Sequence, residues 1–150
     1  MNRKPELPSD LRQKIDEAQI ASGILYKAGN VDGAIEASMV GWNLIPEPKA
    51  KWDYYPQSMS AHFLQSYAML GDIENTKKWV EITAQMYDDP NHEDHYVLML
   101  EGEAMYRLGD LDRAYYVFAR IHEIYGRNGF AEDQIKYLKF FLKEQARRDG

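Results

Sequence analysis

The stretch YRLGDLDRA, residues 106–114, decides the fold, because its pattern occurs three times along the chain. YKAGNVDGA at 26–34 and AMLGDIENT at 68–76 carry a glycine, a polar residue and an apolar residue in the same order. The turn glycines, Gly29, Gly71 and Gly109, are separated by 42 and then 38 residues. Repeats of this length indicate stacked supersecondary units, so the pattern bears on the architecture of the whole chain.

Apolar residues flank each turn at the spacing of one helix face. Around the first turn they are Ile15, Ala18, Ala21, Ile24 and Leu25 before it, and Val31, Ala34, Ile35, Met39 and Leu44 after it. This spacing of three and four residues predicts helices rather than strands. Glycine adopts the left-handed backbone that ends the first helix, and the next residue, Asn30, Asp72 or Asp110, can cap the second. Each motif is therefore predicted to be the elbow of a helical hairpin.

Helix-breaking residues and charges set the expected boundaries. Proline follows the first two pairs, at Pro46 and Pro90, where a helix must stop. The segment AEDQIKYLKFFLKEQARR begins with acids and ends with bases, as the helix dipole favours. We expect one all-α domain, 1–150, in which three hairpins form an α-solenoid closed by a C-terminal capping helix. The hairpins are expected over about 10–45, 57–88 and 92–126, and the capping helix over about 130–148.

The connection between the first two hairpins breaks the repeat. IPEPKAKWDYYPQ, residues 45–57, holds three prolines and gathers Trp52, Tyr54 and Tyr55 within four positions. We expect a loop that packs part of its aromatic surface back onto the hairpins. A loop that contacts a partner is the alternative.

Composition limits the classes of partner. The formal charge of −6 and the pI of about 5.2 disfavour nucleic acid and anionic membranes, and they are compatible with a basic protein. The chain has no cysteine, which excludes disulfides and thiolate chemistry. It has no apolar run long enough for a membrane span, and its first residues lack the apolar core of a secretory signal. A cytoplasmic location is expected by default.

Motifs for catalysis or cofactor binding are lacking. No phosphate loop, dinucleotide fingerprint, nucleophile elbow or HExxH motif occurs. NHEDHY, residues 91–96, resembles a metal site most closely, but acids are also expected where a helix begins after a proline. We therefore expect no catalytic residue, metal or cofactor. An enzyme that uses the histidines, Glu101 or Glu103 remains a rival, and the simpler account of Glu101 is a hydrogen bond to a tyrosine or arginine on a neighbouring helix.

Around its turns the sequence resembles the tetratricopeptide (TPR) repeat, over about residues 12–126. Seven residues before the glycine, where the family has a small residue, the three repeats carry Ser22, Leu64 and Gly102. Four before it, where the family has a large residue, they carry Leu25, Tyr67 and Met105. Five after it, where the family has an alanine, they carry Ala34, Thr76 and Ala114, and nine after it they carry Ser38, Val80 and Phe118. Leu64, Thr76 and Ser38 depart from the pattern, and the family's early tryptophan is missing. The resemblance therefore implies degenerate, TPR-like hairpins.

The same resemblance implies a binding groove lined by the first helix of each hairpin. The residues placed there are Tyr26, Lys27, Gln65, Met69, Tyr96, Met99, Glu103, Tyr106 and Arg107. Tyrosine and methionine adapt to a partner surface, and arginine often anchors one. The alternative is that some of these side chains pack against the capping helix or against loop 45–57.

The whole chain also resembles, more loosely, the immunity proteins of bacterial polymorphic toxin systems. The features shared are its short length, its acidity, its TPR-like hairpins and the terminal GFAEDQIKYLKFFLKE motif. The resemblance implies a non-enzymatic protein that binds a basic toxin domain and neutralises it. The alternative is a general adaptor or secretion chaperone that holds a peptide segment in the groove. The sequence leaves the oligomeric state open.

Overall fold

The protein is all-helical. The structure, a computed structural model, describes residues 3–150, and no strand occurs among them. The α-helices are α1 (Ser9–Lys27), α2 (Val31–Leu44), α3 (Tyr55–Leu70), α4 (Ile73–Met86), α5 (His95–Leu108), α6 (Leu111–Tyr125) and α7 (Ile135–Asp149). Short 3₁₀ helices occupy Lys49–Lys51, Gly126–Gly129 and Glu132–Gln134. The prediction of an all-α chain is confirmed.

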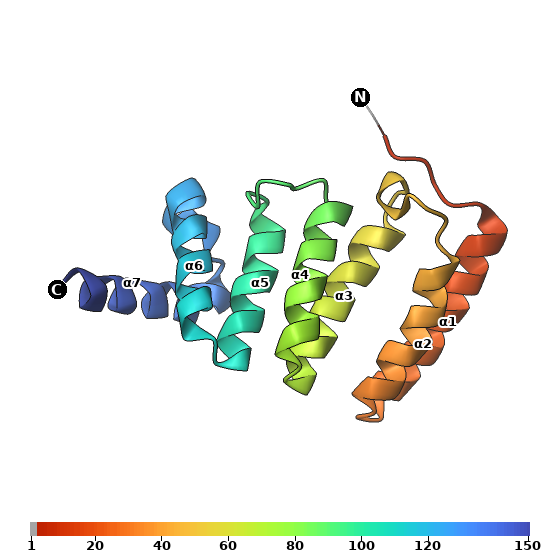
Figure 1. Ribbon diagram of the computed structural model, residues 1–150, viewed down its shortest axis with the longest axis horizontal. Helices are drawn as coiled ribbons and strands as arrows, with labels where there is room; N and C mark the ends of the chain where they lie inside the picture. The colour runs from red at the N-terminus through yellow and green to blue at the C-terminus, as the bar shows by residue number, and fades with distance from the viewer. Residues whose placement is uncertain (1–2) are drawn as a thin grey trace. The chain divides into compact units, whose positions relative to one another are not determined.

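The helices pack as consecutive pairs, α1 with α2, α3 with α4, and α5 with α6 (Figure 1). The chain divides after Asp88 into two compact units. The N-terminal unit holds the first two pairs, and the C-terminal unit, Asp89–Gly150, holds the third pair and α7. No helix of the described residues is both long enough and apolar enough to cross a membrane.

The glycine elbows have the predicted backbone. Gly29, Gly71 and Gly109 have φ angles of +81°, +75° and +82°, in the region that glycine occupies without a steric cost. The residue after each glycine caps the next helix. For example, the Asp72 carboxylate accepts a hydrogen bond from the Asn75 amide at 3.1 Å. Hydrogen bonds from Asn75 also lower the pKa of Asp72, because they stabilise its charged form.

The core of the N-terminal unit is built around three aromatic rings from three helices. Trp79 of α4 lies 4.5 Å from Phe63 of α3 and 5.1 Å from Trp42 of α2, measured between ring centroids. All three side chains are buried. Since α2 belongs to one hairpin and α3 and α4 to the other, the cluster joins the two hairpins of this unit.

Loop 45–57 contacts α1 through one of its three aromatic residues, Tyr55. The Trp52 indole donates to the Pro46 carbonyl at 2.9 Å, and the Tyr55 hydroxyl donates to Asp16 of α1 at 2.8 Å. Burial and the neighbouring Asp16 carboxylate raise the pKa of Tyr55 to about 12. Tyr54 remains 62% exposed. The expected packing onto a hairpin is therefore confirmed for Tyr55, whereas the Trp52 indole is bonded within the loop.

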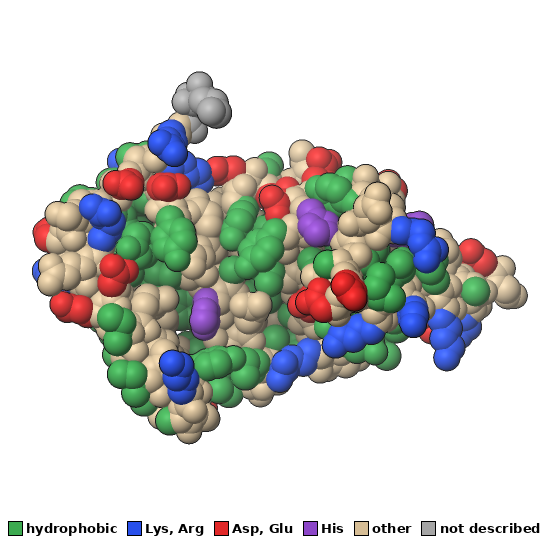
Figure 2. Space-filling model, turned by 180° about the vertical axis from the view of Figure 1, so that it is seen from behind, with side chains coloured by type: hydrophobic (Ala, Val, Ile, Leu, Met, Phe, Trp, Pro, Cys, Tyr) green, Lys and Arg blue, Asp and Glu red, His purple; other side chains and the backbone are tan. Residues whose placement is uncertain are grey.

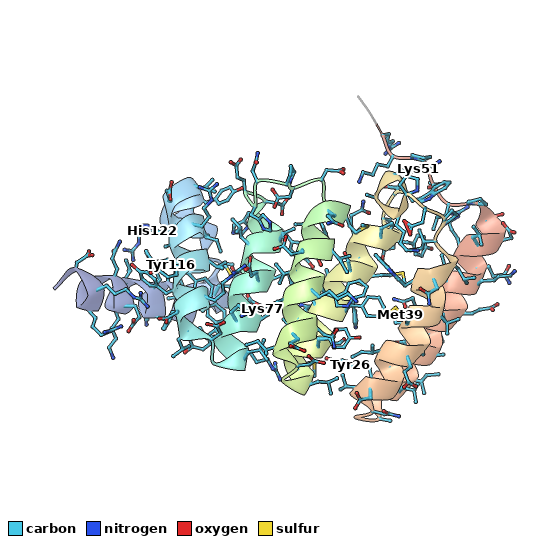
Figure 3. All side chains as sticks on the ribbon, in the orientation of Figure 1. Tyr26, Met39, Lys51, Lys77, Tyr116 and His122 are labelled. Atoms are coloured by element: carbon cyan, nitrogen blue, oxygen red, sulfur yellow. The ribbon has the colours of Figure 1, made fainter. Side chains whose placement is uncertain are left out.

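In the C-terminal unit α7 packs against the hairpin of α5 and α6. Tyr137 of α7 stacks on Phe118 at 5.1 Å, and Phe141 lies 5.1 Å from the ring of His122. Figure 3 shows His122 and Tyr116 on α6 beside α7. The helix begins at Ile135, after a 3₁₀ turn in which the Gln134 amide donates to the Ala131 carbonyl. The predicted segment from about 130 therefore contains a turn before the helix.

Gly102 of α5 lies in close contact with α6. A β-carbon added at Gly102 would lie 2.5 Å from Cε1 of the buried Phe118 ring. We expect Gly102→Ala to lower the free energy of unfolding by about 1–3 kcal/mol, because a packed aromatic ring must move. Urea denaturation followed by circular dichroism measures this change.

Gly23 provides the matched control, because it also lies inside a helix. A β-carbon there meets nothing within 4 Å. Gly23→Ala should raise the free energy of unfolding by about 0.5–1 kcal/mol through helix propensity alone. Equal effects of the two substitutions would contradict the close contact at Gly102.

Candidate protein-binding surface

An exposed cluster of Tyr26, His62, Gln65 and Met69, called here the Tyr26 cluster, joins two helices of the N-terminal unit. The Tyr26 hydroxyl of α1 lies 2.8 Å from Sδ of Met69 of α3. The Tyr26 ring meets the His62 ring edge-on at a centroid distance of 6.0 Å. Figure 3 labels Tyr26, and Figure 2 shows hydrophobic side chains and a histidine on a face of this unit. The predicted residues Tyr26 and Met69 are thus in contact.

Helix geometry explains why α3 presents three members of this cluster together. His62, Gln65 and Met69 are separated by three and four residues, so they lie on one face of the helix. Tyr26 and Met69 are 37% and 39% exposed, and His62 and Gln65 are also exposed. Lys27 is exposed at the end of α1. The surface therefore offers apolar area with polar tips, a composition typical of protein interfaces.

Two acidic residues at the hairpin elbows act on Tyr67 of α3. Burial and then the negative charges of Asp72 and Asp32 raise the pKa of Tyr67. Asp32 follows Gly29 in the chain and Asp72 follows Gly71, so each lies close to its elbow. Tyr67 of α3 thus has negative charge from both hairpins near it.

The predicted site residues of the C-terminal unit are largely engaged by their own unit. Tyr106 meets the rings of Tyr137 and Phe140 of α7 edge-on, at 5.3 and 5.1 Å. The Glu103 carboxylate accepts a hydrogen bond from Gln134 at 3.2 Å. Burial raises the pKa of Glu103, and the Gln134 hydrogen bond partly offsets this rise. The alternative of packing against the capping segment therefore holds for both residues.

Met99 requires a correction. Its side chain is only 4% exposed, so it forms part of the core rather than of a free surface. The sequence pattern could not separate the two cases, since methionine serves in cores and at interfaces alike. Tyr96 is 50% exposed and Arg107 is exposed, so both remain accessible.

Glu101 has the structural partner that its burial requires. Glu101 is 3% exposed, its carboxylate accepts a hydrogen bond from Nε of Arg113 at 2.7 Å, and Nη2 of Arg113 forms an ion pair with it at 2.7 Å. The expectation of a hydrogen bond to a neighbouring helix is confirmed, and the partner is an arginine of α6.

The histidine-rich segment at the start of α5 forms a helix cap. Asp94 accepts from the Val97 amide at 3.0 Å, and Asp89 accepts from the amides of Glu93 and Asp94. The His95 ring lies against the Gly129 carbonyl and the Tyr125 ring. Over residues 3–150, no group of three or more histidine, aspartate or glutamate side chains is arranged to hold a metal ion.

No protein family, curated protein or solved structure matches the chain.

Proposed function

We propose that the protein is a non-enzymatic binding module that binds a partner protein through the Tyr26 cluster. The observation that carries the proposal is the exposed contact between Tyr26 and Met69, which brings adaptable aromatic and thioether surface from two hairpins together. Each hairpin has the same glycine elbow, which supports reading them as degenerate TPR-like repeats. A solenoid built from such repeats binds partners along its first helices.

The more specific proposal is an immunity protein that neutralises a basic toxin domain. The formal charge of −6 favours a basic partner. Complementary charge speeds association, and tyrosine and methionine anchors then slow dissociation. A toxin that acts on nucleic acid is expected to be basic, because it must bind near negatively charged phosphate groups.

Co-expression with neighbouring gene products tests the immunity proposal. One neighbour should be toxic when expressed alone and tolerated when expressed with this protein. The purified pair should bind through a folded domain of the toxin. Binding to short linear peptides in place of a folded domain would favour the adaptor or secretion chaperone, and the absence of any rescued toxic neighbour would contradict the immunity proposal.

Substitution of the cluster tests the surface. Tyr26→Ala and Met69→Ala should each weaken binding of the partner about 10- to 30-fold, the usual effect at an interface anchor. Isothermal titration calorimetry measures the dissociation constants. Tyr116→Ala, which changes a tyrosine of α6 that is 62% exposed, is the matched control and should leave binding within about twofold. Equal losses from all three variants would contradict the placement of the site.

A further inference from the structure

Helix α1 has an apolar face that no part of the described chain covers. Ile20 and Ile24 are each 65% exposed, the largest exposed fraction of any large hydrophobic side chain in residues 3–150. The buried residues of α1 are Ile15 and Ser22. At 100° per residue, Ile20 and Ile24 point to the opposite side of the helix from these two. They also point away from Tyr26, so this face is separate from the Tyr26 cluster.

The exposed face has the spacing of a coiled-coil seam. Gln13, Glu17, Ile20, Ile24 and Lys27 follow one another at intervals of four, three, four and three residues, and all are exposed. This alternation keeps side chains on one stripe that can pack against a second helix. The two isoleucines lie at the middle of the stripe, with an acid toward one end and a base at the other.

The stripe is complementary to itself when two copies run antiparallel. Ile20 and Ile24 lie two residues on either side of position 22, and Glu17 and Lys27 lie five residues on either side. A two-fold axis through position 22 therefore places Ile20 opposite Ile24 of the second copy, and Glu17 opposite its Lys27. Neither Glu17 nor Lys27 has an ion pair within residues 3–150, so both charges are free for this pairing.

We propose that the protein forms a homodimer by antiparallel pairing of α1 with α1 of a second copy. Two apolar layers form the centre of the interface, and two Glu17–Lys27 pairs flank them and fix the register. One helix per protomer buries less surface than a standard interface, so the dissociation constant should be on the order of 10–100 µM. The Tyr26 cluster stays outside the interface, so the dimer would carry two copies of the proposed binding surface.

Sedimentation velocity from about 1 µM to 1 mM tests the dimer, since this range spans the expected dissociation constant. The wild-type chain should pass from monomer to dimer, whereas Ile20→Asp/Ile24→Asp should remain monomeric throughout. Val40→Asp changes an aliphatic residue of α2 that is 61% exposed, and it should dimerise as the wild type does. Far-UV circular dichroism checks that each variant is folded. A wild-type chain that stays monomeric, or a double variant that still dimerises, overturns the proposal.

Charge reversal tests the register. Glu17→Lys places two lysines opposite each other at both ends of the seam, and Lys27→Glu places two glutamates there. Each single variant should dimerise at least tenfold more weakly than the wild type. A mixture of the two variants restores opposite charges at both ends, so it should form a heterodimer with close to wild-type affinity. A mixture that remains as weak as its components overturns the antiparallel register.

Discussion

Replacement of Trp79 by alanine is expected to lower the free energy of unfolding of the N-terminal unit by about 3–5 kcal/mol. Trp79 is 3% exposed and touches Trp42 and Phe63, so its removal leaves a cavity where α2, α3 and α4 meet. The two hairpins of this unit depend on the same cluster. Urea denaturation followed by circular dichroism is the appropriate measurement, because the substitution also alters the fluorescence signal.

Trp52→Ala is the matched control for this experiment. Trp52 lies in the loop, is only partly buried and holds one hydrogen bond to the Pro46 carbonyl. Its replacement should lower the free energy of unfolding by about 1 kcal/mol. A greater loss from Trp52→Ala than from Trp79→Ala would show that the core of the unit lies elsewhere.

Replacement of Arg113 by alanine should have the second large effect, a loss of about 3 kcal/mol in the free energy of unfolding. The reason is the carboxylate that the change leaves behind. Glu101 is buried, and the Arg113 guanidinium both donates a hydrogen bond to its carboxylate and forms an ion pair with it. Without that partner the buried charge loses the cation that stabilises it.

Two further variants separate the charge effect from lost packing. Glu101→Leu combined with Arg113→Ala removes the stranded charge, so it should recover most of the stability lost in Arg113→Ala. Arg120→Ala removes another guanidinium of α6, one that pairs with the exposed Glu93. This change should lower the free energy of unfolding by less than about 0.5 kcal/mol. Failure of the double variant to recover stability would indicate that Arg113 acts through its aliphatic stem.

The local rules of sequence accounted for much of the fold. Glycine at positive φ and a capping residue after it are short-range requirements, so the elbows at Gly29, Gly71 and Gly109 were readable from the pattern. The start of α7 was harder to predict, because the 3₁₀ turn at Glu132–Gln134 depends on a hydrogen bond from Ala131 to the Gln134 side chain. Burial in α1 was also less readable, because apolar spacing included Ile24, which is 65% exposed.

The candidate site was predictable only in part. The sequence pattern predicted Tyr26, Met69 and Met99 as residues of a binding surface. Tyr26 and Met69 are in contact and exposed, whereas Met99 is buried. Periodicity describes one helix at a time, so it could not anticipate that α7 would contact Tyr106. His62 was missed, although its spacing of three residues from Gln65 and seven from Met69 was a signal that it shares their face.

Hydrogen–deuterium exchange of the chain with and without its partner locates the binding surface without a substitution. Binding should slow exchange in the second half of α1 and of α3, around Tyr26 and Met69. Slower exchange confined to α4 and α6, with α1 and α3 unchanged, would contradict a protein-binding module that acts through the Tyr26 cluster.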